Sequence, residues 1–269
     1  MRTARARGLS LATFTAVVLA VGGCSGDGGT TPGAGTPSGS APSASTSAGP
    51  ADPAATSALA DAAAKLGTTS FKVTMTAGPG LNLTGLMDAP NGVGTGTLKA
   101  IGPNTEIEIK TLLVEKDLYV QVPGITKAGT WTHVDVSRLP EGANVGLRPG
   151  QIDPANTAQL LSSTTDVQQA GSGSYKGTLD LTRAAGVAGV DQKAVTTWGA
   201  QAKNVPFTAG VDDQGRLSAL TVQLPAANGQ QAHPLEVLYT DYGTKVEAQR
   251  PPASEITEAP DSLYKSFGG

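Results

Sequence analysis

The chain has 269 residues, of which 15% are charged and 4% aromatic, and its formal net charge is −3. This length suits one large domain or two small ones, and the weak negative charge argues against a nucleic-acid partner. One cysteine and two histidines exclude an intrachain disulfide and leave little material for a metal cluster or a histidine-dependent triad. The composition therefore favours a protein that is not an enzyme and that holds no metal or cofactor.

The first 23 residues predict a secretory signal peptide. Three arginines precede an apolar stretch at residues 9–21, which is too short to span a bilayer as a mature helix. The stretch ends in V-G-G-C at residues 21–24, which resembles the lipobox of bacterial lipoproteins, although Val21 stands where leucine is commonest. This resemblance implies cleavage before Cys24 and lipidation of its thiol. The alternative is an ordinary secreted protein whose cysteine lies there by chance.

Residues 24–54 predict a lipidated cysteine followed by a disordered tether. In residues 25–54, 28 of 30 positions are Gly, Ser, Thr, Pro or Ala. Such a segment buries too little apolar surface to offset the entropy of ordering. As a flexible coil it spans about 30 Å on average, so it lets a folded domain stand off a membrane.

Residues 55–269 predict the folded domain. It opens with an alanine-rich helix over residues 55–66 that ends at Gly67. Apolar and polar residues then alternate along four segments and again over residues 131–136, which is typical of antiparallel strands with one wet face. The four segments are residues 70–76, 81–87, 106–110 and 118–122. Residues 114–117 read as a hairpin turn.

The second half of the domain predicts two more helices and four more strands. A helix is expected over residues 151–165, with Asp153 as its N-cap and Pro154 at its first position. A second is expected over residues 191–202. The strands are expected at residues 175–181, 205–211, 216–224 and 235–242. With about ten strands and three or four helices, the fold class is α+β, a single domain on a large antiparallel sheet.

Several motifs that suggest chemistry have simpler interpretations. Gly92, Gly94 and Gly96 mimic a phosphate loop, but residues 97–101 predict a strand where a dinucleotide site needs a helix. We therefore expect a glycine-rich bend or a close backbone approach. The adjacent carboxylates at 212–213 fit a hairpin tip better than a cation site. His133 lies in a strand and His233 in a loop, and the sequence identifies no nucleophile for either.

The sheet itself leaves two alternatives. Each strand has an aliphatic row, yet few helices are available to cover it. The sheet either packs tightly on those helices, which the pattern alone favours, or curls around a space whose aliphatic lining suits lipid tails.

The order of these features resembles the LppX/LprA/LprF/LprG family of actinobacterial envelope lipoproteins. Besides the lipobox and tether, the likeness rests on TSFKVTM at 69–75, WTHV at 131–134, and DP at 153–154 leading to LLSSTTDV at 160–167. It continues with YKGT at 175–178, VDDQGRL at 211–217 and YTDYG at 239–243, running to the prolines at 251–252. It covers residues 55–255.

The resemblance implies a carrier of the LolA/LolB type, in which a curved antiparallel half-barrel has helices covering its concave face and encloses an apolar cavity. It further implies a non-enzymatic protein, anchored at the extracytoplasmic face of the cell membrane, that binds an acylated glycolipid or triacylglycerol-type lipid. A membrane lipid transporter is an expected partner. The alternative is a lipid-anchored scaffold with a packed core and no ligand. From the alternation we assign the cavity lining to Phe71, Val73, Met75, Leu83, Ile107, Ile109, Leu118, Val120, Leu160, Leu161, Trp198 and Phe207.

Overall fold

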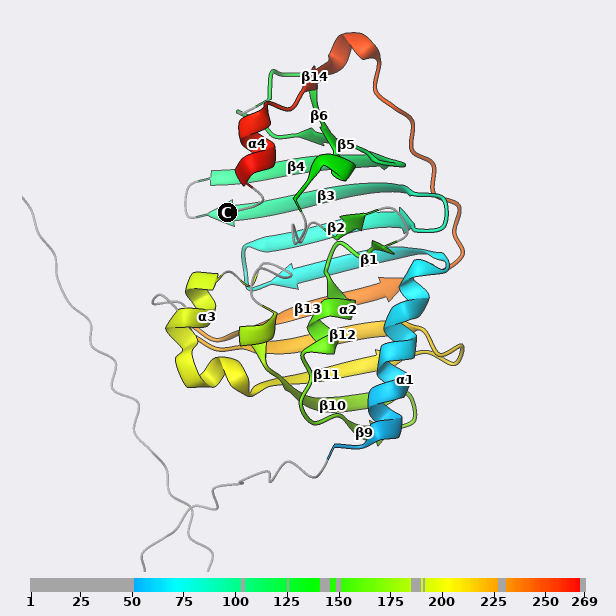
Figure 1. Ribbon diagram of the computed structural model, residues 1–269, viewed down its shortest axis with the longest axis vertical. Coiled ribbons are helices and arrows are strands. Elements are labelled where there is room, and N and C mark those ends of the chain that lie inside the picture. Colours follow the sequence, from blue (N-terminus) through cyan, green and yellow to red (C-terminus); the bar gives the residue numbers. More distant parts are fainter. Residues whose placement is uncertain are drawn as a thin grey trace, which may run out of the picture. The chain divides into compact units, whose positions relative to one another are not determined.

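The alternating segments pair into one open, curved sheet of 12 strands (Figure 1). The computed structural model describes residues 51–102, 105–124, 126–140, 146–148, 151–184, 190, 192–226 and 231–266, all within a compact unit that spans residues 46–269. The predicted α+β class and the large curved sheet are confirmed. The predicted signal peptide, Cys24 and nearly all of the tether lie outside the described residues.

Two antiparallel meanders make up the sheet. The first runs through β1 (Ser70–Ala77), β2 (Leu81–Asp88), β3 (Val93–Gly102), β4 (Thr105–Val114), β5 (Asp117–Gln121) and β6 (Trp131–Asp135). The second runs through β9 (Gln168–Gly171), β10 (Ser174–Leu179), β11 (Val205–Val211), β12 (Leu217–Leu224) and β13 (His233–Thr240). They join where β1 pairs with β13, and β14 (Ile256–Glu258) adds a parallel pair on β6.

Among the described residues, four α-helices accompany the sheet. They are α1 (Pro53–Ala64), α2 (Thr157–Ser162), α3 (Gln192–Trp198) and α4 (Asp261–Ser266). A small hairpin of β7 (Leu147–Arg148) and β8 (Gln151–Ile152) leads into α2. Figure 1 shows α1 and α2 in front of the β9–β13 half of the sheet, and α1 contacts α2, β9 and β12. We call the face that carries these helices the inner face, and the other the outer face.

The inner face is closely packed where the helices lie. Val73, Leu160, Leu220 and Leu235 are each 0% exposed, so no space large enough for a water molecule adjoins them. They belong to one hydrophobic cluster that also includes residues of α1, α2 and α3. At roughly 1.5–3 kcal/mol for each fully buried aliphatic side chain, this cluster is the main source of stability.

Helix boundaries differ from the sequence-based expectations. The first helix begins at Pro53 with Asp52 as its N-cap, so the predicted tether ends too late. The second predicted helix was too long, because α2 occupies only Thr157–Ser162, and the left-handed Asn156 (φ 49°), not Asp153, precedes it. The third divides into α3 and a 3₁₀ segment at Gly199–Lys203, because Gly199 takes a positive φ of 54°.

Strand boundaries agree more closely. Residues 205–211 form β11 as expected, and Glu115–Lys116 make the predicted turn between β4 and β5. The last long strand ends at Thr240, two residues early, because Asp241 takes a positive φ of 52°. None of the described helices is both long and apolar enough to cross a membrane.

Candidate functional site

Two apolar rows run across the inner face of the first meander. Strand pairing places Met75, Leu83, Leu98 and Ile109 side by side on β1, β2, β3 and β4. A second row, nearer one end of the strands, joins Ala77, Leu81, Ala100 and Ile107. Since neighbouring strands lie about 4.8 Å apart, each row is about 14 Å long.

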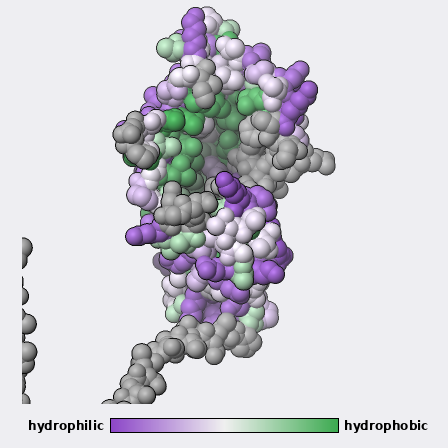
Figure 2. Space-filling model, turned by 90° about the vertical axis from the view of Figure 1, so that its left-hand side faces the viewer, coloured by the Kyte–Doolittle hydropathy of each residue, from purple (hydrophilic) through white to green (hydrophobic). Residues whose placement is uncertain are grey.

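Along each row, the side chains become more exposed with distance from α1 and α2. Met75 on β1 is buried, whereas Leu83, Leu98 and Ile109 are only partly buried and Ile107 is 38% exposed. Val120 on β5 is also partly buried on this face. Figure 2 shows a hollow lined by hydrophobic residues in this half of the unit. We call it the apolar hollow and define it by the partly exposed inner-face residues Leu81, Leu83, Leu98, Ile107, Ile109 and Val120.

Glycines shape one side of the apolar hollow. Gly85 and Gly96 are paired on the inner face, next to Gly94. A Cβ on Gly85 would lie 2.6 Å from Met87 Cε, and one on Gly94 would lie 2.7 Å from Met87 Sδ. The flexible thioether of Met87 therefore lies across positions without side chains. Gly92 lies in the turn before β3 with a φ of 66°, so the predicted bend is found there, whereas β3 continues through Gly94 and Gly96. The atoms nearest to Gly94 and Gly96 belong to side chains, so the predicted close approach of backbone is not found at these two positions.

The predicted cavity lining divides into two groups. Four of its residues belong to the apolar hollow: Leu83, Ile107, Ile109 and Val120. Seven lie in the packed core: Phe71, Val73, Met75, Leu160, Leu161, Trp198 and Phe207. Leu118, 8% exposed, also belongs to the core cluster. The predicted cavity roofed by Leu160 and Leu161 is therefore wrong in position, because α2 packs directly onto the sheet.

Sequence reasoning missed Leu81 and Leu98 as parts of the apolar hollow. Both alternate with polar neighbours, Asn82 and Thr97 or Lys99, so the period-two pattern was a usable signal. What the pattern could not show is which half of the sheet the helices cover.

A polar network fixes α2 to the centre of the sheet. The Tyr239 hydroxyl donates to Asp153 Oδ1 at 3.2 Å and lies 2.6 Å from Thr157 Oγ1, while Ala158 N donates to Asp153 Oδ2 at 3.0 Å. Burial of the carboxyl raises the pKa of Asp153 despite these hydrogen bonds. Burial also raises the pKa of Tyr239 well above its usual value, so its hydroxyl stays protonated as a donor. Asp153 therefore links the first turn of α2 to β13, although Asn156 is the N-cap residue.

A second network lies at the β6 edge of the sheet. His133 Nδ1 is 2.8 Å from Glu258 Oε2 on β14, and His133 Nε2 is 3.0 Å from Asp117 Oδ1 on β5. Arg250 Nη2 lies 2.6 Å from Asp117 Oδ2. Partial burial disfavours the charged imidazolium, but the hydrogen bonds to Glu258 and Asp117 outweigh it and raise the pKa of His133. The network joins three strands and has no access to the apolar hollow, because His133 lies on the outer face.

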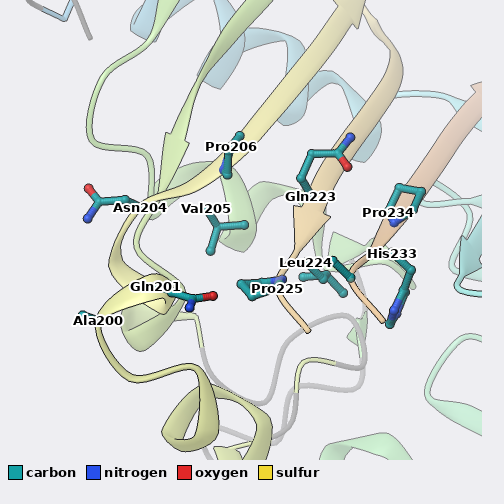
Figure 3. A pocket seen from close by; sticks show the side chains of 11 residues that line it. Ala200, Gln201, Asn204, Val205, Pro206, Gln223, Leu224, Pro225, His233 and Pro234 are labelled. Carbon is teal, nitrogen blue, oxygen red and sulfur yellow. The ribbon is translucent and has the colours of Figure 1, made fainter. Parts of the chain in front are cut away.

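A separate open pocket of about 560 Å³ lies where β11 begins, β12 ends and β13 begins (Figure 3). Val205, Leu224 and Pro225 form apolar parts of its wall, and Gln201 and Gln223 lie at its side. Because this pocket is open and lined by both apolar and polar side chains, it points to no particular class of ligand. Within the part of the chain that the structure describes, no cluster of three His, Cys, Asp or Glu side chains could hold a metal ion.

No family model matches this chain, and no curated protein matches it. The likeness to the LppX/LprA/LprF/LprG lipoproteins thus stays a prediction. The site is accordingly defined by its geometry: a partly exposed apolar surface on the inner face of a curved sheet, beside packed parts of the same face.

Proposed function

We propose that this protein is a membrane-anchored, non-enzymatic carrier that binds an acyl chain of a lipid in the apolar hollow. The observation that supports this is the pair of apolar rows whose outer members are left partly exposed on a concave face. A concave surface lined mainly by aliphatic side chains, with Thr111 beside Val120 as a neighbouring hydroxyl, suits a ligand that needs burial more than orientation.

The energetics favour such a ligand. Each methylene removed from water contributes about 0.8 kcal/mol, so exposing an acyl tail of about 16 carbons costs on the order of 10 kcal/mol. A surface about 14 Å long can shield much of one tail. The polar head group would remain in water at the rim. This site accommodates one tail more readily than the several tails of a triacylglycerol.

The predicted lipid anchor would localise the carrier to a membrane. A diacylglyceryl group on Cys24 would hold the protein at the extracytoplasmic face of the membrane, because two or more chains anchor stably. The tether would let the domain reach lipid in that membrane or a membrane lipid transporter. An acylated glycolipid is the cargo that the family resemblance suggests.

A lipid-anchored scaffold is the second candidate. The core beneath α1 and α2 favours it, since it contains side chains that are 0% exposed and leave no space for a ligand there. The partly exposed apolar hollow favours the carrier.

Binding of a fluorescent fatty acid to residues 46–269 separates the two. This unit holds the entire described sheet and core and omits the apolar leader. Leu83→Gln places a polar group in the apolar hollow, and it should weaken probe binding about tenfold. Leu86→Gln is the matched control, because Leu86 is also partly buried on β2 but lies on the outer face.

The carrier requires that the wild type bind the probe and that only Leu83→Gln weaken binding, with both variants equally folded by circular dichroism. Absence of probe binding by the folded wild type would refute the carrier and leave the scaffold. Equal weakening by both variants would show that the probe binds elsewhere.

A further inference from the structure

Two hydroxyl groups interrupt the aliphatic lining on one side of the apolar hollow. Thr111 lies two residues after Ile109 on β4, and strand pairing places it directly beside Val120 of β5. On the other side of Val120 lies Thr132 of β6. All four residues are partly buried on the inner face, whereas Met75, at the β1 end of the neighbouring row, is buried. The hydroxyls therefore mark the β4–β6 side of the apolar hollow as its polar side.

The Thr111 hydroxyl reaches over a position that has no side chain. A Cβ on Gly96, the partner of Thr111 on β3, would lie 2.7 Å from Thr111 Oγ1. Gly96 is itself only partly buried, and the next inner-face residue of β3, Leu98, belongs to the apolar hollow. The hydroxyl thus lies beside space that a ligand in the apolar hollow can reach.

Neither threonine hydroxyl has a hydrogen-bond partner among the described residues, and neither oxygen is fully buried. Threonine suits a strand, so its presence alone needs no explanation. Without a ligand, water can bond to such a hydroxyl. An alkyl chain laid over it would displace that water and leave the hydroxyl unsatisfied, which is costly. A ligand that presents an oxygen acceptor at this point avoids the cost.

The charge of the inner face favours a neutral acceptor. Strand pairing assigns the residues of β1–β6 to the two faces, and none of their inner-face residues is Asp, Glu, Lys, Arg or His. Lys110, the one lysine of β4, lies on the outer face beside Glu108. A carboxylate next to Thr111 would lose water without gaining a cation there. An ester carbonyl accepts the same hydrogen bond without carrying a charge.

We propose that Thr111 orients the ligand, because its hydroxyl donates a hydrogen bond to the carbonyl oxygen of an acyl ester in preference to a free carboxylate. The acyl tail then extends from β4 toward β1 along the row of Ile109 and Leu83, which ends at the buried Met75. The rest of the lipid passes over β5 toward Thr132. This inference rests on the proposed function, since it assigns the polar end of the same site.

The test compares methyl palmitate with palmitate as competitors of the fluorescent fatty acid on residues 46–269. Thr111→Val keeps the shape of the side chain and removes the hydroxyl. It should weaken the binding of methyl palmitate about fivefold, which corresponds to about 1 kcal/mol, and that of palmitate less. Thr97→Val is the matched control, because Thr97 is also partly buried on neighbouring β3 but lies on the outer face. It should leave both affinities unchanged.

The infrared carbonyl band of bound methyl palmitate reports the hydrogen bond directly. Hydrogen bonding lowers the frequency of this band, so the band should move to higher frequency in Thr111→Val and stay in place in Thr97→Val. Folding of both variants is compared with the wild type by circular dichroism.

A carbonyl band and an affinity that are unchanged in folded Thr111→Val would overturn the role of Thr111 and leave the carrier standing. Equal weakening of methyl palmitate and palmitate would overturn the preference for an ester. Equal effects of the two variants would also count against Thr111, because Thr97 lies on the other face of the sheet. Failure of the folded wild type to bind the fluorescent fatty acid would instead refute the proposed function itself.

Discussion

Gly177 shows how one missing side chain admits a neighbouring segment. A Cβ at this position would lie 2.0 Å from the backbone oxygen of Asp166 and 2.9 Å from the ring of Phe207. Backbone cannot move aside as a flexible side chain does, so the segment that follows α2 crosses β10 only because residue 177 is glycine.

Gly177→Ala should therefore destabilise the fold by about 1–3 kcal/mol or more in urea unfolding. Gly171→Ala on neighbouring β9 is the control, because its Cβ would meet nothing nearer than 3.9 Å and neither glycine has a positive φ. A similar loss in both variants would show that strand propensity, not the approach of Asp166, sets the requirement.

The Tyr239 hydroxyl supports a second prediction at the residue scale. Tyr239→Phe removes the donor to Asp153 and the neighbour of Thr157, and leaving such buried groups unsatisfied costs about 1–3 kcal/mol. Tyr175→Phe, similarly buried on β10 but outside this network, should change the free energy of unfolding much less. Equal effects would mean that the hydroxyl contributes little to holding α2.

Among the elements, β14 is the most weakly integrated strand. It has three residues, it is the one parallel partner among the described strands of the sheet, and it lies at the sheet edge. Its link to the sheet includes the pairing of His133 with Glu258 and the donation from Ala259 N to His133 O at 2.9 Å. The charged groups facing His133 are Asp117, Glu258 and, through Asp117, Arg250.

This arrangement gives the stability of the β6 edge a pH dependence. Because the pKa of His133 is raised above its ordinary 6.5, the stabilisation is fully present below pH 6.5 and is lost as pH rises through the folded-state pKa. The difference in free energy of unfolding between the wild type and His133→Gln should thus shrink as pH rises from about 6 to 8. A difference that is constant or that grows with pH would contradict the role of the imidazolium.

The sequence predicted the positions of the strands more accurately than those of the helices. A period of two sustained over five or more residues locates β1, β4, β5 and β11, since burial of one face dictates the pattern. Short elements such as β9, β14 and α4 lack room for a pattern and depend on the surface they dock against. The predicted helix over 151–165 failed for the same reason: Asp153 serves a tertiary network and β8 takes its first two residues.

At the scale of the whole unit, most of the inner face is packed, and one part of the first meander, the apolar hollow, is partly open. The sequence could identify inner-face residues such as Val73 and Ile109 by alternation, but both have the same pattern. Only the placement of α1 and α2 buries the first and leaves the second partly exposed. The sequence therefore predicted the residue type and the face of the candidate site, but not which part of that face is exposed.

Methyl chemical shifts of residues 46–269, recorded with and without a fatty acid, test the central claim most directly. Binding should shift the methyl signals of Ile107, Ile109 and Leu98 while those of Leu160, Leu220 and Leu235 stay in place, because the latter adjoin no free space. Unchanged signals throughout, or changes confined to the core beneath α1 and α2, would contradict an acyl chain in the apolar hollow.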